Sequence, residues 1–182
     1  MALRQALEPI ELLREFPRAL WPDSSREETT SRLLLSRHGG FRHRVEMLLD
    51  ASQAALDGKT SPPDFTYELA RELHFFVPLL EGHHQAESAR LYPRLLQHYP
   101  KLQDKFVILE RDHTHIDQAL DNLAKMPERL MREAPTKAIF HQETDQLCEQ
   151  LYSFQRLLGL HLDDEEDLVI PILLKLNLSL DL

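Results

Sequence analysis

Apolar residues recur at every third or fourth position through four long stretches of the chain, which is the period of an α-helix. We expect helices over about residues 26–56, 64–96, 101–127 and 140–172. Glycine and proline interrupt the pattern between these stretches, within 58–63, 98–100 and at 135. No stretch shows the alternation of a half-buried strand. Four amphipathic helices with short connections predict an all-α fold, an up-down-up-down four-helix bundle.

Two of these helices place histidine and glutamate on the same stripe as their apolar residues. In the second helix the stripe consists of Leu69, Leu73, Phe76, Leu80, His83, Glu87, Leu91 and Leu95. In the fourth helix it consists of Phe140, Leu147, Leu151, Phe154, Leu158, His161, Glu165, Leu168 and Ile172. Polar groups on a core-facing stripe need specific partners, because burying them alone is costly.

The polar pairs belong to a repeated motif. The segments HHQAESARLYPRLL, from His83, and HLDDEEDLVIPILL, from His161, share the pattern His-x3-Glu-x3-[LV]-[YI]-Pro-x-Leu-Leu. A lone histidine, His38 or His113, lies on the apolar stripe of the helix that precedes each motif. A His-x3-Glu pair projects from one helix face and can hold a metal ion between its side chains. The chain therefore resembles a duplicated helical hairpin with two half-sites.

The positions of the turns predict that the four histidines share one layer. Residues equidistant from a hairpin turn lie at the same height on antiparallel helices of equal rise. The midpoint between His38 and His83 is near Thr60, and the midpoint between His83 and His113 is His98. The midpoint between His113 and His161 is Lys137. All these midpoints fall in predicted loops, so the histidines are expected to meet.

Four imidazoles and two carboxylates in one layer predict a site for two divalent ions. Each ion would receive two nitrogen ligands, and Glu87 and Glu165 would bridge the ions. Mixed nitrogen and oxygen ligation suits iron, with manganese and zinc as alternatives. A metal ion is also the natural counter-charge for a buried carboxylate. The predicted metal ligands are His38, His83, Glu87, His113, His161 and Glu165.

On these motifs the chain resembles the hemerythrin-like, or HHE cation-binding, family across about residues 30–176. The resemblance implies a four-helix bundle with a non-haem di-iron centre. It implies that His38 and His113 are the single histidine ligands of the first and third helices. The paired motifs would then be His83 with Glu87, and His161 with Glu165. Members of this family bind or sense oxygen, respond to nitric oxide, monitor iron or repair damaged iron centres.

The chain departs from the classical oxygen carriers of that family in two respects. Those proteins have a fifth histidine one turn after the ligand of the third helix, where this chain has Asp117, and their last motif has a longer spacing. The remaining coordination positions are left open between Asp117, His84, water and an exogenous ligand. His84 directly follows His83 and therefore points about 100 degrees round the helix from it.

Composition and charge exclude several classes of protein. The net charge is −9 and no basic cluster is present, so a nucleic-acid partner is not expected. No apolar stretch has the length of a membrane span or of a secretory signal, so we expect neither membrane insertion nor secretion. The single cysteine, Cys148, suggests a reducing, cytoplasmic compartment. Residues 1–24 contain several prolines and are interpreted as a short N-terminal arm, with the bundle over residues 25–182.

Three functional hypotheses follow. The first is a protein with two non-haem iron ions that binds, senses or handles a small ligand such as O2 or NO, or iron itself. The second is a di-iron oxidoreductase that acts on peroxide or NO. The third is a metal-free helical module that binds a partner through its acidic surface or its arm. The sequence reveals neither an oligomer interface nor a redox partner.

Overall fold

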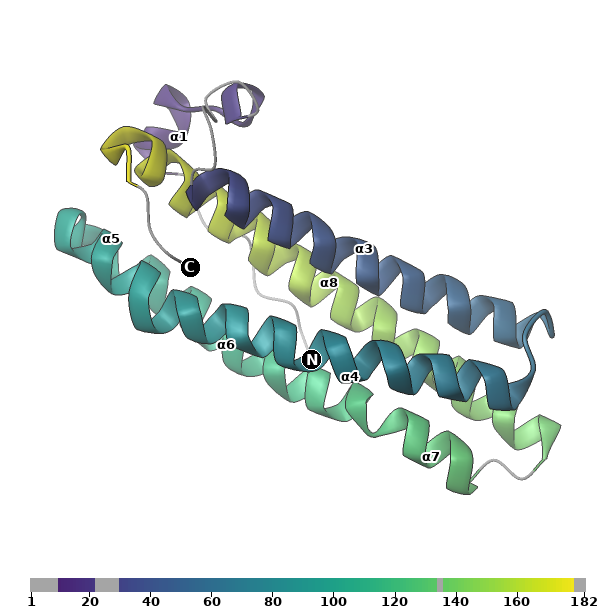
Figure 1. Cartoon of the computed structure of the whole chain (residues 1–182). Coiled ribbons are helices and arrows are strands. Elements are labelled where there is room, and N and C mark those ends of the chain that lie inside the picture. The colour runs from purple at the N-terminus through teal and green to yellow at the C-terminus, as the bar shows by residue number, and fades with distance from the viewer. Residues whose placement is uncertain (1–9, 22–29, 134–135, 179–182) are drawn as a thin grey trace. The chain divides into compact units, whose positions relative to one another are not determined.

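The computed structural model describes residues 10–21, 30–133 and 136–178, and every regular element within these ranges is helical (Figure 1). The prediction of an all-α bundle is therefore confirmed. The elements are α1 (Glu11–Glu15), η1 (Arg18–Leu20), α3 (Thr30–Leu56), α4 (Pro62–Ala86), η2 (Glu87–Leu91), α5 (Tyr92–His98), η3 (Pro100–Leu102), α6 (Gln103–Ala124), α7 (Met126–Glu133) and α8 (Lys137–Leu176).

Local sequence explains how the first long helix ends and the second begins. Gly58 has a φ of 71°. Its amide donates to Ala55 O (3.1 Å) and the next amide, of Lys59, donates to Ala54 O (2.9 Å), which closes α3 in a Schellman motif. Ser61 then accepts a hydrogen bond from the Asp64 amide and caps α4. The helix begins at Pro62, two residues earlier than predicted, because proline is well tolerated in the first helical turn.

The predicted second helix continues to His98, but its hydrogen-bond pattern changes in the middle. Residues Glu87–Leu91, labelled η2, form a single π-helical turn, and the Tyr92 amide donates to Glu87 O. Proline at 93 has no amide hydrogen to donate and would crowd the carbonyl four residues earlier in an α-helix. The wider turn directly before Pro93 accommodates this constraint, and it begins at one of the predicted metal ligands.

The chain divides into two compact units. Unit 1 comprises Met1–Gly40, Gly82–His113 and Gly159–Leu182. Its apolar core contains Trp21, Leu34, Leu91, Tyr92, Leu95, Phe106, Leu109, Leu168, Val169, Ile170, Ile172 and Leu173. The described part of the predicted arm belongs to this unit, and its remaining residues, 1–9 and 22–24, lie outside the described ranges.

Several contacts join the arm to the C-terminal end of α8 within unit 1. Lys175 Nζ donates to Glu15 Oε1 (2.6 Å) and lies 5.9 Å from the centre of the Phe16 ring. The Trp21 indole N–H donates to Phe16 O (2.9 Å), and the ring is only 6% exposed. The Arg18 guanidinium lies 5.3 Å from the centre of that ring. The arm therefore packs against the rest of unit 1 through the buried Trp21 ring and through the contact of Glu15 with Lys175.

Unit 2 comprises Phe41–Glu81 and Thr114–Leu158. Its core contains contacts between aromatic rings. The centre of the Phe76 ring lies 6.2 Å from that of Phe41 and 6.1 Å from that of Phe154, and the Phe65 and Phe140 rings meet edge-on with their centres 6.0 Å apart. Cys148 is buried, as expected for an inert thiol. Among the described residues of the whole chain, no helix is long and apolar enough to cross a membrane.

We predict that Phe76→Ala lowers the free energy of unfolding by about 3–5 kcal/mol, because it removes a ring that is 1% exposed and contacts two other rings. Phe75→Ala is the matched control: the neighbouring ring is 59% exposed, so the change should be within about 0.5 kcal/mol. Chemical denaturation followed by circular dichroism measures both. Similar losses in the two variants would contradict this description of the core.

Candidate metal centre

Seven polar side chains lie together in the interior of unit 1, each at most 4% exposed. They come from four helical stretches: α3, α4 with its π turn, α6 and α8. The structure thus brings together all six predicted ligands, and it adds His84. The seven residues are His38, His83, His84, Glu87, His113, His161 and Glu165.

The first of two groups consists of His38, His83, Glu87 and Glu165, whose donor atoms lie within 4.8 Å of one another. The Nε2 atoms of His38 and His83 are 3.1 Å apart. His83 Nε2 lies 2.9 Å from Glu87 Oε1, and His38 Nε2 lies 3.4 Å from Glu165 Oε2. Two imidazole nitrogens and two carboxylate oxygens therefore point at one small volume.

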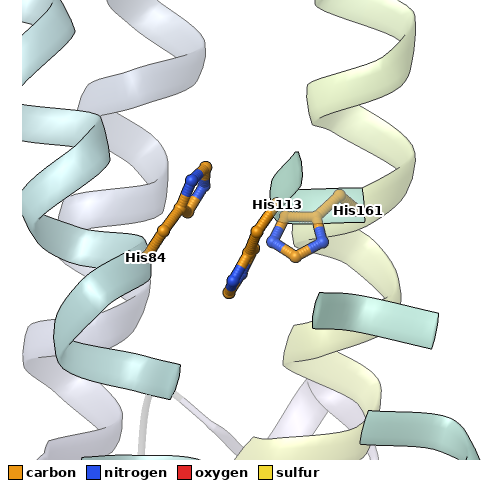
Figure 2. Close-up of side chains that lie close together, drawn as sticks. All are labelled: His84, His113 and His161. Carbon is orange, nitrogen blue, oxygen red and sulfur yellow. The ribbon is translucent and has the colours of Figure 1, made fainter. Parts of the chain in front are cut away.

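The second group consists of His84, His113 and His161, again with donor atoms within 4.8 Å of one another (Figure 2). The His84 and His113 rings stack at 4.1 Å with an interplanar angle of 11°, whereas His161 meets His113 at 71°. Imidazole lone pairs lie in the ring plane, so two parallel rings do not aim at one point. Coordination of a single ion by all three would require the His84 or His113 ring to turn.

Glu87 and Glu165 lie between the two groups of histidines. Glu87 Oε1 contacts His83 of the first group, while its Oε2 lies 3.5 Å from His113 Nε2 of the second. Glu165 Oε2 lies 3.4 Å from His38 Nε2 and 3.8 Å from His161 Nε2. Each carboxylate therefore faces histidines of both groups, which is the placement that a bridging ligand requires.

Several of these buried atoms have no hydrogen-bond partner among the described residues. They are both carboxylate oxygens of Glu87, Glu165 Oε2 and both ring nitrogens of His161. Buried polar atoms are nearly always satisfied, and leaving a charged carboxylate unsatisfied costs several kcal/mol. A cation bound between imidazole and carboxylate donors would satisfy them, so the residues present fit a metal ion such as iron, manganese or zinc.

The family model for the hemerythrin HHE cation binding domain matches residues 29–173. The chain belongs to this family. No curated protein and no solved structure gives a significant match to it. Membership of a cation-binding family and the two buried histidine and glutamate groups together indicate that this hemerythrin-like domain binds metal.

In the metal-free hemerythrin-like centre, charge and burial hold Glu165 and His113 in the protonation states that bind metal, whereas they hold His38 protonated, so that His38 must lose a proton to become a ligand. Burial lowers the pKa of His38, but contacts with Glu165, Glu166 and Glu87 outweigh it and raise that pKa well above its usual value. Burial raises the pKa of Glu165, yet the contact with His38 outweighs it and holds that pKa well below its usual value. Burial, reinforced by the neighbouring His84 and His161, lowers the pKa of His113 to about 2. Glu165 is thus an ionised carboxylate and His113 a neutral imidazole.

Glu166 and Arg18 form an outer layer behind His38. Glu166 is only 5% exposed, and its Oε1 lies 3.0 Å from His38 Nδ1, so it does not belong to a solvated acidic face. Arg18 NH1 lies 3.7 Å from Glu166 Oε2, while Arg18 Nε donates to Asp167 (2.7 Å). A carboxylate on the second nitrogen of a ligand histidine fixes the tautomer and the orientation of the ring.

Two other histidines that we predict to be ligands have different contacts on their outer ring nitrogens. His113 Nδ1 lies 3.3 Å from the Ser88 hydroxyl, which donates to Glu110 Oε2 (2.7 Å). His161 Nδ1 lies 3.8 Å from Asp112 Oδ2, which is beyond hydrogen-bond distance. The two half-sites are therefore not equivalent in their surroundings, although the sequence motif repeats.

The remaining histidines and Asp117 are in neither group. Asp117 is a partly buried residue of unit 2. His43, His74 and His98 are exposed, and His115 and His141 are partly buried. Of the two side chains considered for the additional coordination position, only His84 lies beside the predicted ligands.

We predict that Glu166→Ala weakens metal binding by about 10–100-fold, because His38 loses the carboxylate that orients it. Asp163→Ala is the matched control: this residue is on the same helix and also contacts Arg18 at 3.5 Å, but its side chain is 56% exposed. Titration against a competing chelator measures both affinities. Equal affinities for Glu166→Ala and the control would show that Glu166 does not support the site.

Proposed function

We propose that the protein holds two non-haem iron ions and binds or senses a small ligand such as O2 or NO, or handles iron itself. The observation that supports this best is the placement of Glu87 and Glu165, each of which faces histidines of both groups. One shared carboxylate could serve a single ion, but two carboxylates between two histidine groups suit a pair of ions. Manganese and zinc are the alternative metals for this donor set.

His38 and His83 would hold one ion, and His113 and His161 the other, with His84 as an additional ligand of the second. Bound iron would supply a redox-active centre that takes up small molecules. The protein side chains position the donors and limit water: the apolar residues Leu91, Leu109 and Leu168 of unit 1 are at most 3% exposed. Glu166 and Ser88 would orient His38 and His113, respectively, through contacts with the Nδ1 atoms of these rings.

Two other hypotheses differ in what they require. A di-iron oxidoreductase acting on peroxide or NO would use the same residues and would additionally show turnover with a reductant. A metal-free interaction module would leave the Glu87 carboxylate buried without a hydrogen bond among the described residues, which is energetically unfavourable. We therefore favour the metal-binding function.

We further propose a cytoplasmic location, from the single buried Cys148, and no nucleic-acid partner, from the net charge of −9. An acidic protein lacks the positive surface that a phosphate backbone attracts.

We predict close to two iron atoms per chain after anaerobic reconstitution with ferrous iron and subsequent oxidation. The oxidised protein should absorb in the near ultraviolet, because carboxylate-bridged or oxo-bridged ferric ions have charge-transfer bands there. Metal analysis and absorption spectroscopy on the same sample test this. Saturation at zero or one iron would contradict the two-ion centre.

We predict that Glu87→Ala loses both ions, whereas His113→Ala loses mainly one, because a bridging carboxylate serves both ions and each histidine serves one. His115→Ala, on the same helix but in neither group, is the control and should retain both. Iron content after gel filtration gives the comparison, and circular dichroism verifies that each variant is folded. Loss of one ion from both Glu87→Ala and His113→Ala would show that Glu87 does not bridge.

A further inference from the structure

Tyr92 is a buried phenol that contacts two of the proposed ligands. It is the first residue of α5 and is 2% exposed. Its hydroxyl donates to Glu165 Oε1 (2.7 Å), and the same oxygen lies 3.3 Å from His113 Nε2. The ring packs against Phe106 at 4.9 Å and is nearly parallel to the His113 ring. Packing against these two rings therefore fixes the direction in which the hydroxyl points.

The π turn explains how Tyr92 reaches this position. In a regular α-helix, a residue five positions after Glu87 would point about 140 degrees away from it. The π turn wraps one extra residue between Glu87 and Tyr92, as the hydrogen bond from the Tyr92 amide to Glu87 O records. This extra residue rotates Tyr92 back towards the face of Glu87 and into the interior.

We propose that the Tyr92 oxygen is a metal ligand, bound as phenolate to the ion that His113 holds; this rests on the proposed iron centre. Two donors at right angles on one ion, each bonded at about 2.1 Å, lie about 3.0 Å apart. The distances from the Tyr92 oxygen to Glu165 Oε1 and His113 Nε2, 2.7 and 3.3 Å, lie on either side of this value. The Tyr92 oxygen therefore lies at about the spacing of a shared ligand from each of these two donor atoms.

The chemistry of the step is simple. The phenol releases its proton to solvent, the oxygen forms a bond to the ion, and no electrons are transferred. Phenolate is an anionic oxygen donor of the kind that ferric iron accepts from tyrosine in other proteins. In the metal-free protein the hydroxyl carries its proton and donates it to Glu165 Oε1 in a hydrogen bond. A cation bound to the oxygen would take the place of this proton.

The second copy of the motif lacks this donor. At the position equivalent to Tyr92 it has Ile170, and at the position equivalent to His84 it has Leu162, both fully buried apolar residues. Both additional donors therefore belong to the first copy and lie with the His113 group. The assignment predicts one ion with more protein ligands than the other.

Visible absorption of the iron-loaded protein tests the assignment, because phenolate bound to ferric iron gives a charge-transfer band in the visible range. We expect this band in the wild type and its loss in Tyr92→Phe, with iron content and the near-ultraviolet absorption unchanged. Tyr99→Phe is the control: Tyr99 is a partly buried tyrosine at the other end of α5 that also packs against the core of unit 1. The zinc-loaded wild type should have no visible band.

A second variant makes the test independent of whether Tyr92→Phe folds. The chain has only four tyrosines, so replacing Tyr67, Tyr99 and Tyr152 by phenylalanine leaves Tyr92 as the sole phenol. This variant should keep the band and show phenolate vibrations in resonance Raman spectra. An iron-loaded wild type without the band, or Tyr92→Phe that retains it, would overturn the assignment while the two-iron centre stands. A wild type that takes up no iron would overturn both.

Discussion

Two carboxylates buried among imidazoles, at Glu87 and Glu165, are the constraint on which unit 1 depends. Their side chains are at most 1% exposed, and isolated charges in such surroundings are strongly destabilising. The His38 imidazole offsets part of this cost through its contact with Glu165. Neither oxygen of Glu87 makes a hydrogen bond among the described residues, although Oε1 lies 2.9 Å from His83 Nε2. A cation between the two groups would satisfy both carboxylates at once, and the stability of unit 1 and metal binding would then depend on the same atoms.

The fold class and the six motif residues were predictable because they follow from a regular helical period. His38, His83, His113 and His161 meet because α-helices rise by a constant amount per residue and the connecting turns have matching positions. Helix ends were less predictable. The predicted third helix ends at Ala124, and a separate helix, α7, follows after one residue. Local propensity does not distinguish one long helix from two short ones.

The side chains that the sequence did not reveal are those whose placement breaks the period or depends on tertiary contacts. The position of Tyr92 beside Glu165 and His113 could not be predicted, because the π turn adds one residue to the helical turn that precedes it. Pro93 was the local sign of that turn. His84 was left as one of several candidates because it points about 100 degrees from His83 on an ideal helix. The contact of Glu166 with Arg18 could not be foreseen because nothing in the sequence places these two residues side by side. Distant segments must be packed before such roles are visible.

The contact between Arg18 and Glu166 couples the N-terminal arm to the interior of unit 1. Arg18 belongs to η1, whereas Glu166 belongs to α8 and contacts His38. If His38 holds an ion as proposed, docking of the arm and binding of that ion would be linked equilibria, and linkage is reciprocal. A partner that draws the arm away would weaken metal binding, and a bound ion would in turn hold the arm in place. Through the ion pair of Arg18 with Glu166, the position of the arm would then depend on whether metal is bound in the interior of unit 1.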